Sequence, residues 1–167
     1  LTHEAHAAAR ENILRNNLQH RLESICCDLR NLPPEFQRSS FHCCVSNPPY
    51  FSGGPASLST PLARREDCCT PENLFLTAAK ALRYGGDFFL VHKPERLAQL
   101  ISCGAHCALE AKRLRLIRHK EGGPITLVLL SFRKGGKPGL TIDEYSLFDS
   151  HGAPTAYYRE VYHILEA

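Results

Sequence analysis

The chain has 167 residues, a formal net charge of +3 at pH 7 and 43% hydrophobic residues. This length suits one domain with a substantial core, so we expect a single domain over residues 1–167. No apolar run approaches the roughly 20 residues that cross a membrane, and no secretory signal pattern opens the chain. These features argue against a membrane-spanning or secreted protein and favour a soluble, cytoplasmic one without a membrane partner.

The eight cysteines favour free thiols over a disulfide framework. Six of them form three adjacent pairs and the other two lie one helical turn apart, so none has the Cys-x-x-Cys spacing of a zinc site. Reduced, partly buried thiols are typical of cytoplasmic proteins. We therefore expect no disulfide scaffold and no metal site.

Apolar periodicity and Gly/Pro punctuation predict alternating helices and strands. The predicted helices cover residues 3–17, 70–84, 94–106 and 155–165. The predicted strands cover residues 21–27, 41–45, 88–91, 111–119, 125–132 and 140–148. Residues 52–70 are rich in Gly, Ser, Pro and charged residues, which predicts a long surface loop of the kind that is usually functional or mobile. This order of elements indicates an α/β fold.

The sequence Asn-Pro-Pro-Tyr-Phe at residues 47–51 directly follows the predicted strand 41–45. Ligands of open α/β sheets bind at such strand ends. Asn47 precedes a proline and is therefore biased towards extended backbone, and its amide oxygen and the Pro48 carbonyl are two acceptors for one –NH2 group. Tyr50 offers a ring for stacking. The set suits the exocyclic amine of a flipped-out base or a carboxamide nitrogen, and a plain double-proline turn is the alternative.

This motif resembles the Asn-Pro-Pro-Tyr motif of the amino-methyltransferases, class I enzymes that use S-adenosylmethionine. Over nearly its whole length the chain is similar to bacterial tRNA (adenine-N6)-methyltransferases that modify an adenine beside the anticodon. The further segments that carry this resemblance are residues 63–66, 82–88, 93–97, 112–115 and 134–139, the last reading Lys-Gly-Gly-Lys-Pro-Gly. The resemblance implies a Rossmann-like class I methyltransferase fold, with a mostly parallel sheet and an antiparallel C-terminal hairpin. It also implies methyl transfer to the N6 amine of an adenine in tRNA.

The same resemblance assigns site residues. Asn47, Pro48 and Tyr50 correspond to the catalytic loop of the family. Asp28 and Leu29 resemble the acidic motif after the third strand, which faces the adenine amino group of the cofactor. Together with Asn47 they form the expected binding set for S-adenosylmethionine.

One family feature does not occur in the sequence. No G-x-G-x-x-G-like turn follows a strand, because every glycine lies downstream of Asn47. The resemblance places the glycine loop, the first strand and the acid that binds the cofactor ribose before residue 3. We therefore expect an N-terminally truncated domain with a gap in the sheet between residues 22–27 and 41–45, which binds S-adenosylmethionine weakly and is inactive by itself.

A basic segment follows in the C-terminal half. Eight lysines and arginines fall within 26 residues, with Glu121 as the one acid among them. A hairpin with this charge is a plausible phosphate-binding face, and a solvated polar face of two strands is the alternative. The expected substrate- and RNA-binding residues are Phe51, Lys112, Arg113, Arg115, Arg118, Lys134 and Lys137.

Two other functions fit part of the sequence. A protein-glutamine N5-methyltransferase of the release-factor type shares the Asn-Pro-Pro-Tyr motif, because a carboxamide is also a planar –NH2 group. A catalytically inactive fragment that binds only RNA or a partner chain is the other alternative. The basic hairpin and the Lys-Gly-Gly-Lys-Pro-Gly segment favour the tRNA methyltransferase.

Overall fold

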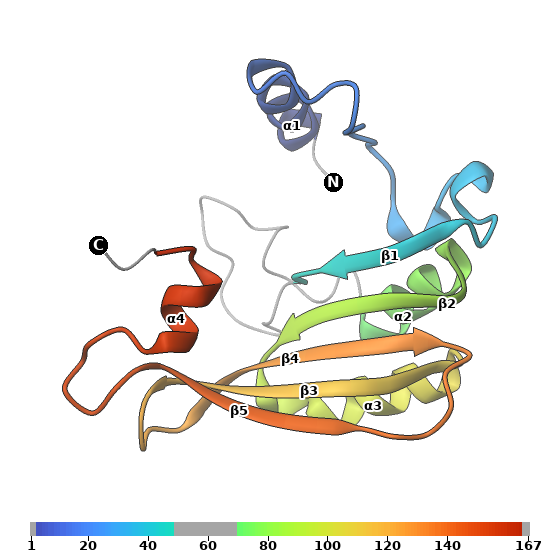
Figure 1. Ribbon diagram of the computed structural model, residues 1–167. Helices are drawn as coiled ribbons and strands as arrows, with labels where there is room; N and C mark the ends of the chain where they lie inside the picture. Colours follow the sequence, from blue (N-terminus) through green and yellow to red (C-terminus); the bar gives the residue numbers. More distant parts are fainter. Residues whose placement is uncertain (1–2, 49–69, 165–167) are drawn as a thin grey trace, which may run out of the picture.

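The computed structural model describes residues 3–48 and 70–164 and centres on a five-stranded sheet with strand order β1-β2-β4-β3-β5 (Figure 1). The strands are β1 (Phe41–Ser46), β2 (Leu82–His92), β3 (Leu109–Lys120), β4 (Ile125–Lys134) and β5 (Thr141–Phe148). The helices are α1 (His3–Arg15), α2 (Pro71–Ala81), α3 (Leu97–His106) and α4 (Ala156–Val161), with short 3-10 turns η1 (Leu29–Asn31), η2 (Pro34–Phe36) and η4 (Pro94–Arg96).

Four of the five strands point the same way. β1 is parallel to β2 and β3 is parallel to β5, whereas β4 is antiparallel to both of its neighbours. The carboxyl ends of β1, β2, β3 and β5 therefore lie at one edge of the sheet, which we call the carboxyl edge. The expected mostly parallel sheet with an antiparallel hairpin, formed by β3 and β4, is confirmed.

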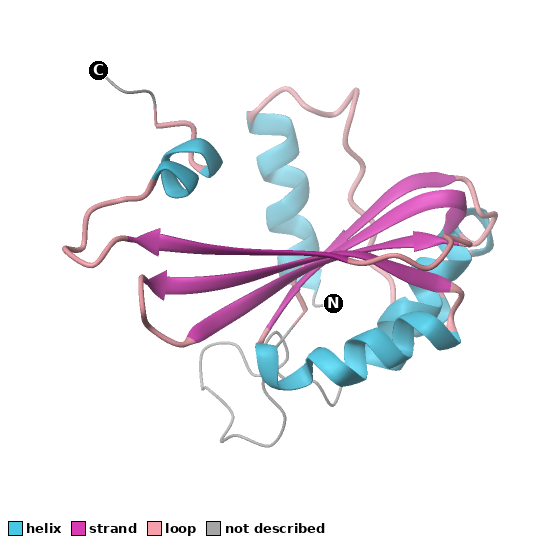
Figure 2. Ribbon diagram, turned by 60° about the horizontal axis from the view of Figure 1, so that its bottom comes forward, coloured by secondary structure: helices cyan, strands magenta, loops and turns pink. Residues whose placement is uncertain are grey.

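Helices α2 and α3 cover one face of the sheet (Figures 1 and 2). The ring of Phe75 in α2 meets Phe88 and Phe132 nearly edge-on, with centroids 5.2 and 5.0 Å away. Thr70 caps α2 by accepting the N–H of Asn73, and Pro71 begins the helix, as the sequence predicted. This aromatic cluster and the leucines around it form the core and hold β2 and β4 against α2.

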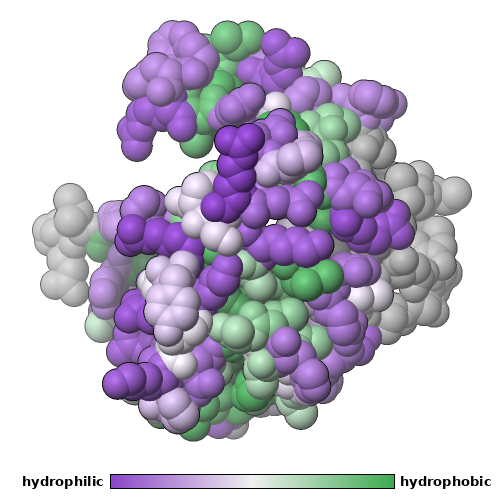
Figure 3. Space-filling view, turned by 90° about the vertical axis from the view of Figure 1, so that its right-hand side faces the viewer, coloured by the Kyte–Doolittle hydropathy of each residue, from purple (hydrophilic) through white to green (hydrophobic). Residues whose placement is uncertain are grey.

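The other face of the sheet, which we call the open face, presents apolar side chains to solvent. Val45 is 77% exposed and Phe89, its partner on β2, is 43% exposed. The strand register continues this row to Ser131 and Arg113. The end of the sheet opposite the carboxyl edge has a mostly hydrophilic surface with scattered apolar residues (Figure 3).

Two sequence predictions about secondary structure are wrong. Residues 21–27 were expected to form a strand, but they form no strand and pair with none of the described ones. Their alternating pattern indicates extended backbone, yet a strand also needs a neighbour to receive its hydrogen bonds. Between this segment and β1 lies a cavity of about 390 Å³.

The second wrong prediction concerns the end of α2. Gly85 and Gly86 were expected to end the helix, but α2 ends at Ala81 and β2 begins at Leu82. The backbone of Leu82 is already extended, and this residue pairs with Phe41 of β1. Gly85 instead supplies a positive φ of 77° within β2, which few other residues adopt without strain.

Two further predicted elements appear with other bounds: the predicted strand 88–91 is part of β2, which begins at Leu82, and the helix predicted for 155–165 ends at Val161. The predicted strand 140–148 appears as β5, and all six described cysteines are free. The predicted loop 52–70 lies almost wholly outside the described residues. Of the helices within residues 3–48 and 70–164, none is both long and apolar enough to cross a membrane.

Candidate active site at the carboxyl edge

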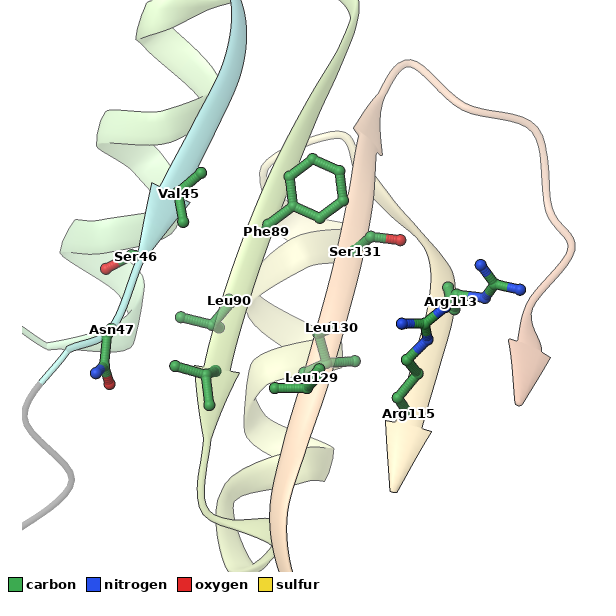
Figure 4. A pocket seen from close by; sticks show the side chains of 11 residues that line it. Val45, Ser46, Asn47, Phe89, Leu90, Arg113, Arg115, Leu129, Leu130 and Ser131 are labelled. Atoms are coloured by element: carbon green, nitrogen blue, oxygen red, sulfur yellow. The ribbon is translucent and has the colours of Figure 1, made fainter. Parts of the chain in front are cut away.

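Asn47 and Pro48 follow β1 directly and lie at the carboxyl edge (Figure 4). Ser46, the last residue of β1, pairs with Leu90 of β2, and this pairing fixes the position of the residue after it. The side chain of Asn47 is exposed, and Pro48 is half-buried. Tyr50 and Phe51 lie outside the described residues, so their predicted roles stay predictions.

A cavity of about 390 Å³ connects Asn47 with two arginines of β3 on the open face. Its floor is apolar, and Figure 4 shows side chains of the four strands β1, β2, β4 and β3 along it. The lining residues are Val45, Ser46, Asn47, Phe89, Leu90, Val91, Arg113, Arg115, Leu129, Leu130 and Ser131. The structure therefore brings the expected catalytic asparagine and two of the expected RNA-binding residues to one cavity.

The two arginines are held by groups on β5. Nε of Arg113 lies 2.7 Å from Oδ2 of Asp143, and Nε of Arg115 lies 3.7 Å from the same oxygen. The guanidinium of Arg115 also lies over the ring of Tyr145, 5.5 Å from its centroid. One carboxylate thus neutralises one of two positive charges, which leaves this end of the cavity cationic.

Arg118 lies nearer the end of β3 and has its own acidic partner. Its Nε donates to Glu144 at 2.7 Å. This hydrogen bond raises the pKa of Arg118 and lowers the pKa of Glu144. The guanidinium of Arg118 therefore lies at the carboxyl edge, and the carboxylate of Glu144 compensates its charge.

Of the described RNA-binding candidates, Lys134 and Lys137 lie towards the opposite end of the sheet. Lys134 pairs with Leu109 at the start of β3, and its Nζ donates to the carbonyl oxygens of Ala79 and Leu82. Lys112 donates to the backbone carbonyl of Lys137 at 2.9 Å. Because β4 runs antiparallel to β3, Lys134 and Lys137 lie away from the carboxyl edge, whereas Lys112 directly precedes Arg113 in β3.

Asp28 and Leu29 lie beside the other cavity, the one between β1 and the segment that precedes it. The carboxylate of Asp28 accepts the backbone N–H of Arg30 and binds its guanidinium, with Oδ2 2.6 Å from the terminal nitrogen. The side-chain hydrogen bond to Arg30 is the largest cause that lowers the pKa of Asp28 to about 2. Leu29 lines the same cavity as Ser46, the residue before Asn47. Of the predicted cofactor residues, Leu29 lines this cavity and Asn47 lines the cavity on the open face, and Ser46 borders both.

Sequence reasoning missed Tyr145 and its stacking partner Tyr157. Their rings are stacked with centroids 4.1 Å apart, and Tyr145 holds the guanidinium of Arg115. The alternation within residues 141–148 places Asp143 and Tyr145 on the same face of the strand. That alternation was the signal that could have identified them.

Comparison with known proteins finds methyltransferases with similar sequences. No family model matches the chain. Over 129 residues it is 30% identical to a tRNA1(Val) (adenine(37)-N6)-methyltransferase of Bacteroides fragilis, a match that covers 74% of this chain and 53% of that protein. Over 102 residues it is 29% identical to the enzyme of the same name from Shewanella halifaxensis, which covers 60% of this chain and 42% of that protein. The chain therefore spans about half the length of the curated relatives that it matches.

Solved structures define the fold class. A protein described as a predicted O-methyltransferase from Agrobacterium tumefaciens superposes with a TM-score of 0.78 at 18% identity, over 97% of this chain and 74% of that one. The geranyl diphosphate C-methyltransferase of Streptomyces coelicolor gives a TM-score of 0.55 at 10% identity, over 80% of this chain and 60% of that one. The chain has the Rossmann-like fold of the class I methyltransferases. Within that class, its sequence is similar to tRNA1(Val) (adenine(37)-N6)-methyltransferases.

Proposed function

We propose that the chain carries the catalytic loop of an S-adenosylmethionine-dependent enzyme that methylates the N6 amine of an adenine beside the anticodon of a tRNA, in the cytoplasm. The observation that carries this proposal is the position of Asn47 and Pro48 at the carboxyl edge of a methyltransferase sheet. The similarity to tRNA1(Val) (adenine(37)-N6)-methyltransferases supports adenine as the base and position 37 as its place.

The described residues fit one side of S-adenosylmethionine, which supplies an activated methyl group on a sulfonium. Leu29 offers apolar surface to a purine ring, and its cavity reaches Ser46 at the end of β1. The carboxylate of Asp28 binds Arg30 but keeps lone pairs that can accept an adenine amino group. Asn47 follows Ser46 directly and would meet the cofactor where this space reaches the end of β1.

The chemical task of Asn47 is to hold and activate the target amine. The lone pair of an adenine amino nitrogen is delocalised into the ring. Acceptors at the Asn47 side chain and the Pro48 carbonyl bind the two N–H groups, turn the amine out of the ring plane and aim the lone pair at the methyl carbon. Methyl transfer is an in-line displacement, so such positioning supplies most of the acceleration. Tyr50 stacks on the base, with Phe51 beside it.

Contacts to the RNA backbone are assigned to the arginines nearest Asn47. Arg113 and Arg115 share its cavity, and Arg118 lies further along β3 towards the same edge. Lys134 and Lys137 lie at the opposite end of the sheet and would reach only a distant part of a tRNA, whereas Lys112 directly precedes Arg113. Charge neutralisation at the carboxyl edge makes binding salt-dependent.

The experiment is methyl transfer from radiolabelled S-adenosylmethionine by the full-length protein. Unmodified tRNA and unmodified release factor are offered in parallel, and the labelled nucleoside is identified after digestion. Label in N6-methyladenosine at position 37 is the expected result. Label in a glutamine of the release factor, with none in tRNA, would overturn the proposal in favour of the glutamine methyltransferase. Asn47→Ala is the matched inactive control.

A further inference from the structure

We propose that four aromatic residues at the carboxyl edge form a stacking platform for an unpaired base of the RNA substrate, at a distance from the base that is methylated. The inference rests on the proposed function and names a second contact with the same substrate. The four residues, which we call the aromatic row, are His119, Phe148, Tyr158 and Tyr162.

The rings of the aromatic row follow one another in contact. The centroid of His119 lies 5.1 Å from that of Phe148, which lies 5.1 Å from Tyr158, and Tyr158 lies 4.5 Å from Tyr162. The two inner rings are half-buried and attach α4 to β5, whereas the two end residues are exposed. Tyr162 is 59% exposed. A row that only anchored α4 would not need exposed rings at both ends.

The backbone around the aromatic row is held in place before any ligand binds. Thr155 caps α4 by accepting the N–H of Tyr158, and its hydroxyl donates to the carbonyl of Ser146 at 2.6 Å. The N–H of Glu121 donates to the carbonyl of Phe148 at 2.9 Å, which joins the end of β3 to β5. Asp149 binds the N–H groups of the turn that follows, at residues 151 and 153. An ordered aromatic surface loses little entropy when a base stacks on it.

The position of the row sets which nucleotide it meets. β3 and β5 end at the carboxyl edge, and Figure 1 places α4 on the side towards which β1 points. The strand register places Ser46 of β1 level with Leu114 of β3, whereas Lys120 at the end of β3 lies six residues further along, which is about 20 Å. With three to four strand spacings of about 4.8 Å added across the sheet, the row lies about 25–28 Å from the end of β1, or about seven to eight stacked nucleotides of about 3.4 Å each. It therefore reads a flanking base, not the target.

The chemistry of the row suits an unpaired base. Aromatic side chains stack on any of the four bases, and proteins that bind single-stranded RNA combine such rings with nearby cations. Lys120 is exposed beside His119, and Arg118 precedes it. A double-stranded helix offers no free base face, so the row distinguishes a loop from a stem.

The test is binding of a fluorescein-labelled RNA hairpin with an adenine-containing loop to the full-length protein, measured by anisotropy. Tyr162→Ala should weaken binding about tenfold, Tyr162→Phe should leave it unchanged, and His119→Ala should weaken it as well. The matched control is Tyr84→Ala, a tyrosine that is 78% exposed and lies in the part of β2 far from the carboxyl edge. Circular dichroism establishes that each variant folds.

Three outcomes separate the aromatic row from the proposed function. Loss of binding in Tyr162→Ala and not in Tyr84→Ala supports the row, even if no RNA is methylated. Equal binding by Tyr162→Ala and wild type overturns the row, even if tRNA is methylated normally. Equal losses in Tyr162→Ala and Tyr84→Ala also overturn it, because the effect would then not depend on the position of the ring.

Discussion

The ammonium group of Lys134 donates to the carbonyl oxygen of Leu82 at 2.7 Å, and so joins the end of β4 to the junction of α2 and β2. The same nitrogen lies 2.5 Å from the carbonyl of Ala79 and 3.2 Å from the hydroxyl of Ser39. The last carbonyls of a helix have no partner within the helix and carry partial negative charge, so a lysine is a fitting partner. Lys134 is thus positioned to stabilise the fold.

Replacement of Lys134 should lower the free energy of unfolding, and it should have a smaller effect on the free energy of RNA binding. Lys134→Met keeps the apolar stem and removes the charged donor, and hydrogen bonds to charged groups contribute about 1.5–3 kcal/mol each. Because Lys134 is only half-buried, we expect a loss of about 1–2 kcal/mol in the free energy of unfolding, measured by urea denaturation. The control is Lys137→Met, an exposed lysine of the same segment, which should change stability by less than about 0.5 kcal/mol. Equal effects of the two substitutions would contradict this role.

The carboxylate of Glu72 should make stability depend on pH in the acid range. Its own backbone N–H lowers its pKa most, followed by the side chain of Gln99 at 3.0 Å and by Thr70, and the result is a pKa of about 2. The pKa is lower in the folded state than the ordinary value of about 4.3, so the folded protein gains stability from this group above that pH. The gain is lost as the pH falls from about 4.3 to 2.

Comparison with Glu72→Gln isolates this contribution. Glutamine keeps the shape of the side chain but does not titrate. Urea midpoints of the two proteins should differ by a constant amount above about pH 5 and converge as the pH falls below 4. A difference that stays constant down to the lowest pH at which the proteins fold would show that the ionisation of Glu72 does not contribute.

Gly104 of α3 should tolerate no side chain, although alanine favours helices by about 1 kcal/mol over glycine. A Cβ at this position would lie 2.7 Å from the ring of Phe132 and 2.8 Å from the carbonyl of Leu109. Phe132 is fully buried in the core and cannot move aside cheaply. Gly104→Ala should therefore lower the free energy of unfolding by about 1–3 kcal/mol, as overpacking does.

The matched control for this position is Ala105→Gly, the next residue of the same helix, which is exposed. At this exposed position only the helix propensity of the residue changes, so we expect a loss of about 1 kcal/mol in the free energy of unfolding. If Gly104→Ala were more stable than wild type, the close packing of α3 against β4 would be refuted. Thermal denaturation of the three proteins is sufficient to decide.

The parts of the site that the sequence predicted are those fixed by local chemistry. Asn47 could be placed at a strand end because an apolar strand, a double proline and the strand-end rule all act within ten residues. The alternation of β3 likewise placed Leu114 in the core and Arg113 on the opposite face. Such patterns depend on the pleat of one strand and not on what packs against it.

The parts that could not be predicted depend on contacts between distant segments. Lys134 finds its carbonyl partners more than 50 residues away in the sequence, and no local pattern encodes that meeting. Residues 21–27 alternate like a strand, but pairing is a property of two segments and not of one. The aromatic row was missed for the same reason, since its rings come from β3, β5 and the end of α4.

The sharpest consequence of the proposed function concerns Asn47. Asn47→Ala removes one of the two acceptors for the target amine, and the loss of one preorganised hydrogen-bonding group in an active site costs about 10²–10³ in kcat. Asn47→Asp keeps an acceptor but adds a negative charge, so it should retain more activity than Asn47→Ala and less than wild type. Single-turnover methylation of tRNA by the full-length protein measures these rates.

Two controls separate catalysis from folding and from binding. His42→Ala changes an exposed residue of β1 that lines neither cavity, and should leave kcat within about threefold of wild type. The RNA affinity of Asn47→Ala should match that of wild type, because the arginines of β3 remain in place. An Asn47→Ala enzyme with wild-type kcat would remove the side chain from the mechanism and leave the Pro48 carbonyl as the sole acceptor.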